Sequence, residues 1–539
     1  MSNNRSYIRV TLLAGLMLII GILIGYYWSF NGKPDVFMPD NSVGKSRKVD
    51  ELLQFISEHY VDKINTDSLM DDVIRDIMSK LDPHSVYIPK KESESVRETM
   101  QGNFVGLGVE FQMNKDTFTI FRVLDNSPAE KAGLRVFDRI IAVDGQAVAG
   151  KHIPLDTIVS KLKGKADTYV NLTVKRFPED TVFQVKIKRE KVPIVSVPAA
   201  FMLNDTLGYI RIEVFSDNTY DEFHKALSRL KQQGLKALIL DLRGNSGGYL
   251  KQANLIADEF LPSGRLIFYT KNHEGNIEKV YATGRGAFEK GPLFVLIDQN
   301  TASASEIVAG ALQDNDRALI VGRRSYGKGL VQEEIPLNDG SIMRITTARY
   351  YTPSGRSIQR PYKKGHKEEY DNDFYLRYYN GELFSKDSIK INKKLKFKTR
   401  GGRTVYGGGG IIPDIFVPLD KSLYHDSYQI IMLRSRLNDI LEDYYRHYFR
   451  ELQSMSEEDF VHNDTLGQSI YRFLLNHEHL SVDDSIPQDK VKRFENTLHA
   501  FLGRNIYGLN AYFAIHAKAD KDIERLLTLP ADSLRIYGH

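Results

Sequence analysis

Between residues 207 and 322 the sequence alternates short apolar runs with amphipathic segments, and this alternation limits the fold more than any other feature. The apolar runs predict strands, and the amphipathic segments predict helices. Strands are expected at 207–212, 236–241, 293–298 and 318–322, and helices at 219–232, 249–259 and 303–315. This order is typical of an α/β sheet domain, which we place within residues 191–420.

The preceding stretch, residues 101–190, has a different period. Short β-like runs follow one another with one helix-like interruption, which predicts a compact β-rich domain. The runs lie at 105–111, 117–123, 139–143, 169–175 and 182–188, and the helix-like segment lies at 154–163. The predicted fold class is therefore α/β, with a β domain inserted ahead of the main sheet.

Helical segments are expected on both sides of these domains. Apolar residues recur at helical spacing through 48–100 until Asp82-Pro83 interrupts the pattern, and this segment is expected to pack on the α/β core. Residues 421–539 also predict helices, to which the sequence assigns no role. The basic stretch 365–405 is expected to be a surface insertion. The helical flanks could pair subunits of a homo-oligomer.

The N-terminal region predicts a membrane anchor. Residues 10–28 form an almost unbroken apolar run, which at about 1.5 Å per residue can just cross a hydrocarbon core of about 30 Å. Because Arg5 and Arg9 flank this run, residues 1–9 are expected in the cytoplasm. The chain beyond the linker at 29–47 is then expected on the periplasmic side of the inner membrane. A cleaved signal peptide is the alternative, but no small-x-small cleavage site follows the run.

Composition excludes several classes of function. The 539 residues carry a net charge of only +4, and the positive charge is scattered, so nucleic-acid binding is not expected. The absence of cysteine excludes disulfides, thiolate zinc sites and a cysteine nucleophile. No HExxH motif and no paired His or Asp spacing is present, so neither a metal nor another cofactor is expected.

A serine stands at one predicted strand-to-helix junction. Ser303 follows the strand at 293–298 and opens the next helix, and such a junction can expose a hydroxyl to a substrate. Its small neighbours Ala302 and Ala304 leave room for a peptide backbone. Serine is also a favoured helix N-cap, and this segment alone favours the cap.

A glycine-flanked lysine follows the next strand. Lys328 lies between Gly327 and Gly329, so the backbone can pack closely around it. A serine hydroxyl needs a base to become a nucleophile, and a lysine serves only if its pKa falls from about 10.4 to about 7–8. Burial away from carboxylates lowers the pKa of an amine in this way. The alternative is an ordinary surface lysine in a glycine turn.

The third segment, Asp241 to Tyr249, is a glycine-rich turn after the strand at 236–241. Its backbone N–H groups could form an oxyanion hole. The turn also places Ser246 in a G-x-S-x-G pattern, which makes Ser246 a rival nucleophile. No Asp–His pair is positioned in the sequence to activate the hydroxyl of Ser246.

Together these segments resemble the C-terminal processing peptidases, also called tail-specific proteases, over residues 48–420. The matching stretches are Leu81-Asp82-Pro83-His84-Ser85, Phe104 to Val109, Gly133-Leu134 with Asp138-Arg139-Ile140, Asp241 to Asn245, Ser303 to Glu306, Gly327 to Gln332 and Thr347 to Gly355. The resemblance implies a serine endopeptidase with a β-rich α/β protease core, in which Ser303 is the nucleophile and Lys328 the general base.

The resemblance also implies supporting groups around this pair. Gln332, four residues after the lysine, would orient its side chain. The oxyanion donors would be the backbone N–H of Gly247 or Gly248, and that of Ala304. The motif does not decide which of the two glycines contributes.

Residues 101–190 resemble a PDZ domain. Gly106 and Gly108 bracket Leu107 just before a strand, and the N–H groups of this turn would bind a terminal carboxylate. The bound peptide would then add as a strand to the edge of the sheet. The expected substrates are extracytoplasmic proteins or peptides with free, apolar C-termini.

The walls of this groove are expected to be apolar. Val109 and Phe111 alternate with Leu107 as pocket walls should, whereas Ile158 and Leu162 suit either the opposite wall or the core. Two other functions remain open at this point. One is a non-catalytic PDZ scaffold, and the other is a different hydrolase that uses Ser246 with a histidine.

Overall fold

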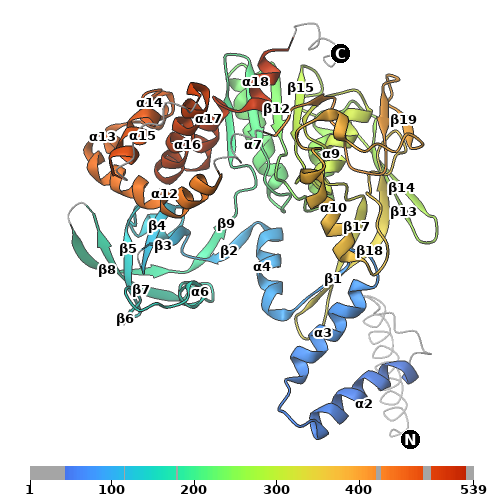
Figure 1. Cartoon of the computed structure of the whole chain (residues 1–539), viewed down its shortest axis with the longest axis horizontal. Helices are drawn as coiled ribbons and strands as arrows, with labels where there is room; N and C mark the ends of the chain where they lie inside the picture. The colour runs from blue at the N-terminus through green and yellow to red at the C-terminus, as the bar shows by residue number, and fades with distance from the viewer. Residues whose placement is uncertain (1–42, 115, 178–179, 420–426, 478–486, 530–539) are drawn as a thin grey trace, which may run out of the picture. The chain divides into compact units, whose positions relative to one another are not determined.

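The computed structural model describes residues 43–529, apart from 115, 178–179, 420–426 and 478–486 (Figure 1). The chain divides into two units after Val73. In the first unit, helix α2 (Val43–His59) leads to α3 (Thr66–Ser79), which runs across the division. The second unit contains the two predicted domains and the C-terminal helices.

A six-stranded sheet forms the centre of the second unit, in the order β10-β11-β12-β15-β16-β21. Its strands are β10 (Ala199–Met202), β11 (Leu207–Arg211), β12 (Ala237–Asp241), β15 (Leu293–Ile297), β16 (Leu319–Gly322) and β21 (Ile415–Phe416). Only β10 is antiparallel to its neighbour. The helices between the strands are α7 (Thr219–Gln232), α8 (Leu250–Asp258) and α9 (Ala304–Asp314). These bounds agree with the predicted ones to within two residues.

Both faces of this sheet are buried. Along β12, Leu238 and Leu240 pack with α7, α8 and α9, whereas Ile239 between them faces the opposite side. There it meets Ile523 and Leu526 of the C-terminal helix α18 (Lys521–Leu527). A mostly parallel sheet needs cover on both faces, so the C-terminal helices complete the core of the α/β domain.

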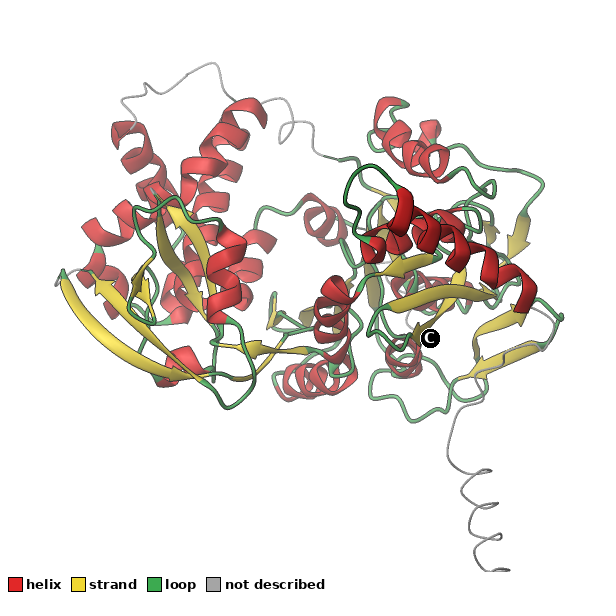
Figure 2. Cartoon of the chain, turned by 90° about the horizontal axis from the view of Figure 1, so that it is seen from below, coloured by secondary structure: helices red, strands yellow, loops and turns green. Residues whose placement is uncertain are grey.

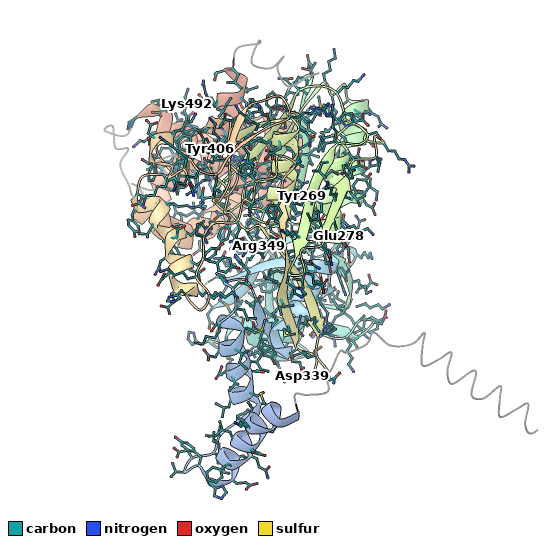
Figure 3. The ribbon with its side chains drawn as sticks, turned by 90° about the vertical axis from the view of Figure 1, so that its right-hand side faces the viewer. Tyr269, Glu278, Asp339, Arg349, Tyr406 and Lys492 are labelled. Atoms are coloured by element: carbon teal, nitrogen blue, oxygen red, sulfur yellow. The ribbon has the colours of Figure 1, made fainter. Side chains whose placement is uncertain are left out.

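A second, antiparallel sheet packs beside the first. It comprises β1 (Val86–Ile88), β13 (Leu266–Asn272), β14 (Ile277–Tyr281), β17 (Leu330–Pro336) and β18 (Ile342–Tyr351). Figure 3 shows Tyr269 on β13 near Arg349 on β18, and Asp339 at the tip of the β17–β18 hairpin. Helix α4 (Lys90–Gln101) follows β1. The predicted surface insertion forms α10 (Lys367–Tyr379), a short 3-10 turn (Lys386–Ser388) and the hairpin β19 (Lys396–Lys398) and β20 (Thr404–Tyr406).

The PDZ-type domain has its own sheet and core. Its main sheet contains β3 (Val109–Asn114), β4 (Thr117–Val123), β5 (Arg139–Val143), β6 (Gln146–Ala147), β7 (Tyr169–Arg176) and β8 (Thr181–Lys188). A separate pair, β2 (Asn103–Gly106) and β9 (Glu190–Pro193), leads to the α/β domain, and the helices are α5 (Pro128–Lys131) and α6 (Leu155–Leu162). Ile158 and Leu162 of α6 are buried in the core of this domain.

The C-terminal helices form a bundle, in which all but the last helix share a separate apolar core. They are α12 (Ser427–His447), α13 (Phe449–Ser454), α14 (Glu457–His462), α15 (Leu466–His477), α16 (Gln488–Tyr507), α17 (Leu509–Ala517) and α18. Figures 1 and 2 place this bundle beside the strands of the PDZ-type domain. Ion pairs join them, among them Glu442 to Arg139 at 2.7 Å and Arg504 to Glu110 at 2.8 Å.

The predicted membrane anchor and the location that followed from it are corrected. Within the described ranges, no helix is both long enough and apolar enough to cross a hydrocarbon core. Helices α12 and α16 have the length, but charged residues such as Glu442 and Arg504 lie along them. The predicted anchor at 10–28 lies outside the described residues. The fold class is therefore restated as an α/β core with a PDZ-type domain and helical flanks, and a single-pass inner-membrane location is not retained.

The cover that α18 gives to the sheet can be tested by truncating one side chain. Ile523 is 1% exposed, whereas Leu527 on the same helix is 57% exposed. We expect Ile523→Ala to lower the free energy of unfolding by about 2–5 kcal/mol, because it removes buried methylenes and leaves a cavity. Leu527→Ala is the matched control and should change it by less than about 0.5 kcal/mol in denaturant titrations. Equal effects of the two substitutions would contradict this packing.

Candidate active site

Ser303 lies at a strained turn between β15 and α9. Its backbone has φ of 56° and ψ of −117°, a conformation that non-glycine residues rarely adopt. Such strain persists only where the surroundings impose it, and it is common at functional sites. Upstream, the Asp298 carboxylate accepts hydrogen bonds from the N–H groups of Asn300 and Thr301. The turn therefore holds Ser303 in a fixed position at the start of the helix.

A buried carboxylate joins this turn to the lysine segment. Glu306 accepts hydrogen bonds from the backbone N–H of Ser303 at 2.9 Å and of Lys328 at 2.8 Å. It also accepts the N–H of Gly327 and the hydroxyl of Ser325. Burial raises the pKa of Glu306 to about 7, while these four donors act in the opposite direction. One side chain therefore fixes the spacing of the two segments, a role that the sequence did not suggest.

The side chain of Lys328 is oriented by a chain of hydrogen bonds. Its Nζ donates to Oε1 of Gln332 at 2.7 Å, and Nε2 of Gln332 donates to the carbonyl of His84. Because a carbonyl can only accept, the amide of Gln332 must turn its oxygen toward the lysine. The pairing of β17 with β18 shifts register between Val331 and Gln332, next to this side chain.

The environment of Lys328 favours a neutral amine. Burial, assisted by the charge of Arg344, lowers the pKa of Lys328 to about 8. Asp82 and Glu306 act in the opposite direction, but they do not outweigh the burial. A neutral amine has a lone pair that can accept a proton, so this side chain has the chemistry of a general base near neutral pH.

Tyr350 on β18 connects the same two segments from the other side. Its buried hydroxyl lies 2.8 Å from the carbonyl oxygen of Lys328 and 3.2 Å from that of Ser303. Burial raises the pKa of Tyr350 well above its usual value, so the phenol stays protonated and donates. Tyr350 lies in the stretch from Thr347 to Gly355 that resembles the family, so this resemblance could have identified it as a functional residue.

The glycine-rich turn after β12 lies against Ser303. A Cβ at Gly247 would come within 2.8 Å of the Ser303 Cβ, and a Cβ at Gly248 within 2.2 Å of the Phe215 carbonyl oxygen. Both glycines have positive φ, 106° and 140°, so larger residues are excluded by conformation as well as by space.

The two glycines differ in what their N–H groups bind. The N–H of Gly247 donates to Oδ1 of Asn245 at 2.8 Å. The N–H groups of Gly248 and Ala304 have no acceptor within the described part of the chain. Within the described residues, the N–H groups of Gly248 and Ala304, rather than that of Gly247, are therefore left without an internal acceptor.

These residues line one cavity of about 890 Å³. It contains Ser303, Lys328, Gln332, Ala304 and both glycines, together with apolar side chains from α4 and β17 such as Val96, Met100 and Val331. Ser246 also lines the cavity, but none of its lining residues is a histidine. The cavity thus brings together every predicted residue of the catalytic group, and it gives Ser246 no histidine partner.

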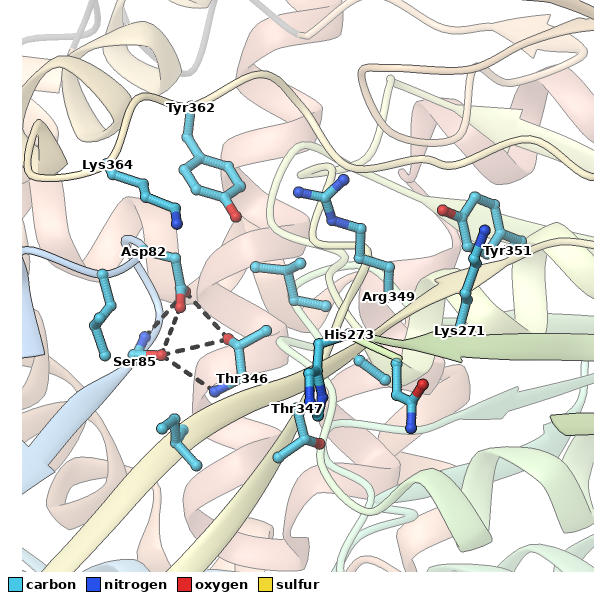
Figure 4. Close-up of a pocket in the computed structure, with 15 residues that line it drawn as sticks. Asp82, Ser85, Lys271, His273, Thr346, Thr347, Arg349, Tyr351, Tyr362 and Lys364 are labelled. Atoms are coloured by element: carbon cyan, nitrogen blue, oxygen red, sulfur yellow. Dashed lines mark hydrogen bonds between the residues drawn. The ribbon is translucent and has the colours of Figure 1, made fainter. Parts of the chain in front are cut away.

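The loop between α3 and β1 supports the Gln332 contact. The Asp82 carboxylate accepts hydrogen bonds from the N–H and hydroxyl of Ser85 and from the hydroxyl of Thr346 (Figure 4). It also accepts the N–H of His84. This turn fixes the His84 carbonyl that Gln332 binds. Asp82 and Ser85 also line a second cavity of about 560 Å³, which none of Ser303, Lys328 and Gln332 lines.

The predicted surface insertion contacts the backbone of the segment that leads to Lys328. Arg377 of α10 is buried and donates to the carbonyl oxygens of Ser325 at 2.8 Å and Tyr326 at 3.0 Å. The guanidinium of Arg360 lies between the rings of Tyr326 and Tyr370. A basic, polar stretch carries no local signal for such contacts, so this prediction of a surface role was incomplete.

The PDZ-type turn is separate from this cavity. The N–H groups of Leu107 and Gly108 have no acceptor among the residues that the structure describes. A Cβ at Gly108 would come within 2.2 Å of the Ser127 Cβ, so the turn needs glycine there. The following strand, β3, lies at the edge of its sheet, with Val109 and Phe111 partly buried against the core. An edge strand beside free N–H groups suits the addition of a peptide strand.

Comparisons with known proteins match both domains. Residues 206–367 match the family model of peptidase family S41, and residues 105–188 match that of the PDZ domain. The chain is 34% identical over 323 residues to the carboxy-terminal-processing protease of Bartonella bacilliformis, covering 59% of this chain and 74% of that protein. It is also 34% identical to the carboxy-terminal processing protease CtpB of Bacillus subtilis, covering 59% of this chain and 66% of that protein. The solved structure of a photosystem II D1 C-terminal processing protease is 30% identical, covers 57% of this chain and 89% of that chain, and superposes with a TM-score of 0.33.

Proposed function

Because the chain belongs to peptidase family S41 and is a carboxy-terminal processing protease of serine type with a PDZ domain, we propose that Ser303 is its nucleophile and Lys328 its general base. The observation that carries this proposal is the half-buried Lys328 amine, held by Gln332 in the cavity that Ser303 also lines. Ser246, the rival nucleophile, has no histidine in that cavity.

In the first half of the proposed reaction, the neutral amine of Lys328 takes the hydroxyl proton of Ser303 while the serine oxygen attacks the carbonyl carbon of a peptide bond. The resulting oxyanion accepts hydrogen bonds from the N–H groups of Gly248 and Ala304. The positive end of the α9 dipole lies at the same place. When the carbon–nitrogen bond breaks, the lysine ammonium gives its proton to the leaving amine.

In the second half, water attacks the acyl-enzyme and Lys328 takes one of its protons. The serine oxygen then leaves and recovers a proton from the lysine, and the product departs with a new carboxylate. Gln332 accepts one amine hydrogen throughout, which leaves the lone pair of Lys328 directed at the reacting atoms. Glu306 keeps the nucleophile and the base at a constant separation.

The same proposal assigns substrate capture to the PDZ domain. A free C-terminal carboxylate would bind the N–H groups of Leu107 and Gly108, and the chain before it would pair with β3. The apolar side chains of Val109 and Phe111 favour an apolar C-terminus over a charged one. Ile158, Leu162 and the side chain of Leu107 are buried in the core of the domain.

The catalytic assignment is tested by three single substitutions. We expect Ser303→Ala and Lys328→Ala each to abolish peptide cleavage, and Ser246→Ala to retain most of it. Because nucleophile and base act as one unit, the double variant of Ser303 and Lys328 should be no less active than either single variant. Release of peptide fragments, followed by chromatography, measures the outcome. Cleavage by Ser303→Ala at the native rate would reject the assignment.

The pH dependence tests the state of the base. Since only the neutral amine accepts a proton and its pKa is lowered to about 8, kcat/KM should rise with pH through that value and then level off. Replacing Arg344 by Gln removes one cause of the lowered pKa, so the rise should move to higher pH. A rise centred near the ordinary lysine value of about 10.4 in the native protein would contradict the lowered pKa on which Lys328 depends as a base near neutral pH.

The capture role is tested by changing only the end of a long peptide substrate. Amidation removes the terminal charge and its charge-assisted hydrogen bonds, each worth about 1.5–3 kcal/mol, so kcat/KM should fall at least about tenfold. A peptide too short to reach from the PDZ domain to Ser303 is the matched control and should not respond to amidation. If the long free-acid and amide forms are cleaved equally well, the domain does not select substrates by their C-terminus.

A further inference from the structure

The glycine turn of the active site is held by residues from the far end of the chain. Arg243 lies inside this turn, and its guanidinium donates to Asp241 at the end of β12. The same guanidinium contacts Asp520 at 2.8 Å and Asp522 at 2.7 Å, both at the start of α18. Almost 280 residues of sequence separate these partners, and residues 520–522 lie beyond the stretch that matches family S41.

The contacts belong to a largely buried cluster of opposite charges. Arg211 and Arg323 join Arg243 on one side, and Asp241, Asp520 and Asp522 stand on the other. The side chains of Asp520 and Asp522 are each only 4% exposed, so their contacts with the guanidinium are shielded from bulk water. Removing a carboxylate from such a cluster leaves a buried cation with too few partners, which must then move or draw in water.

The turn transmits the position of Arg243 to the reacting groups. Two residues after Arg243, Asn245 binds the N–H of Gly247 through its side chain. The Asn245 carbonyl accepts the N–H of Ala302 at 3.0 Å and the hydroxyl of Ser305 at 3.0 Å. The free N–H groups of Gly248 and Ala304 therefore sit on segments that share this one asparagine. A shift of the turn at Arg243 alters the separation of those two donors.

We infer that Asp520 and Asp522 are positioning residues for peptide hydrolysis, which hold the oxyanion donors in place through Arg243. This inference rests on the proposed Ser303–Lys328 mechanism and deepens it, because it assigns part of the active-site geometry to the C-terminal helices. The two aspartates touch neither substrate nor reacting atoms. Their effect falls on the transition state, in which the oxyanion forms, more than on the binding of substrate.

The experiment replaces the two carboxylates by amides of the same shape in the full chain. Asn is also a good helix N-cap, so Asp520→Asn retains the acceptor that binds the N–H groups of Asp522 and Ile523. For Asp520→Asn with Asp522→Asn we expect kcat to fall at least about tenfold while KM changes less than about twofold, since a misplaced oxyanion donor weakens only the transition state. Steady-state cleavage of one peptide and thermal melting are measured on the same samples.

Glu524→Gln is the matched control, because Glu524 lies on the same helix and pairs with Arg493 within the helical bundle. It should leave kcat and KM at native values. A folded double variant with native kcat would overturn the inference, and so would a lower melting temperature without loss of kcat in the folded protein. Ser303→Ala in the same assay separates the two ideas. If it is inactive while the double variant is fully active, only the positioning role fails; if it is active, the proposed mechanism fails.

Discussion

Burial of both faces of the central parallel sheet is the constraint on which the rest of the structure depends. Parallel neighbours β12, β15 and β16 end at the same edge, and their side chains alternate between two apolar layers. The glycine turn, Ser303 and the segment of Lys328 each follow one of these carboxyl ends. In open α/β sheets this edge is where ligands bind, because several turns converge there without disturbing the layers below. The cavity of about 890 Å³ forms at that convergence.

Glu306 fixes the relative positions of the Ser303 and Lys328 segments at this edge of the sheet. A buried carboxylate without its hydrogen bonds is costly, so it stabilises the fold only while its donors are in place. Two of those donors are the N–H groups of Ser303 and Lys328, so loss of either contact exposes the carboxylate to an unfavourable environment. The same charge opposes the lowered pKa of Lys328, and burial outweighs it. Glu306 therefore reduces the lowering of the Lys328 pKa, but it fixes the distance between the segments that carry Ser303 and Lys328.

The sequence predicts those features of the fold that depend on interactions between residues close together in the chain. The strands at 207–322 were placed to within two residues because apolar alternation, glycine and strand-to-helix junctions act over a few neighbours. The glycine-flanked Lys328 and the junction at Ser303 could be found in the same way, although their roles stay proposals. The roles of Arg377 and Asp520 could not be predicted, because these side chains contact residues that lie tens to hundreds of positions away in the sequence. The choice between groove and core for Ile158 also needed the fold, since both explanations require the same apolar residue. The anchor prediction used the apolar run at 10–28 and its flanking arginines, and within the described residues no helix is long and apolar enough to cross a membrane.

The C-terminal bundle links the two sites that the proposed function requires. At one end Asp520 and Asp522 form ion pairs with Arg243 of the glycine turn. At the other end Arg504 forms an ion pair with Glu110 on β3. Alternation along β3 puts Glu110 on the bundle side and Val109 and Phe111 on the core side. A peptide that adds to the free edge of β3 therefore pairs with the same strand that the bundle contacts. The C-terminal helices, which lie outside the matched family stretch, therefore contact both the strand proposed to pair with a substrate tail and the turn proposed to carry an oxyanion donor.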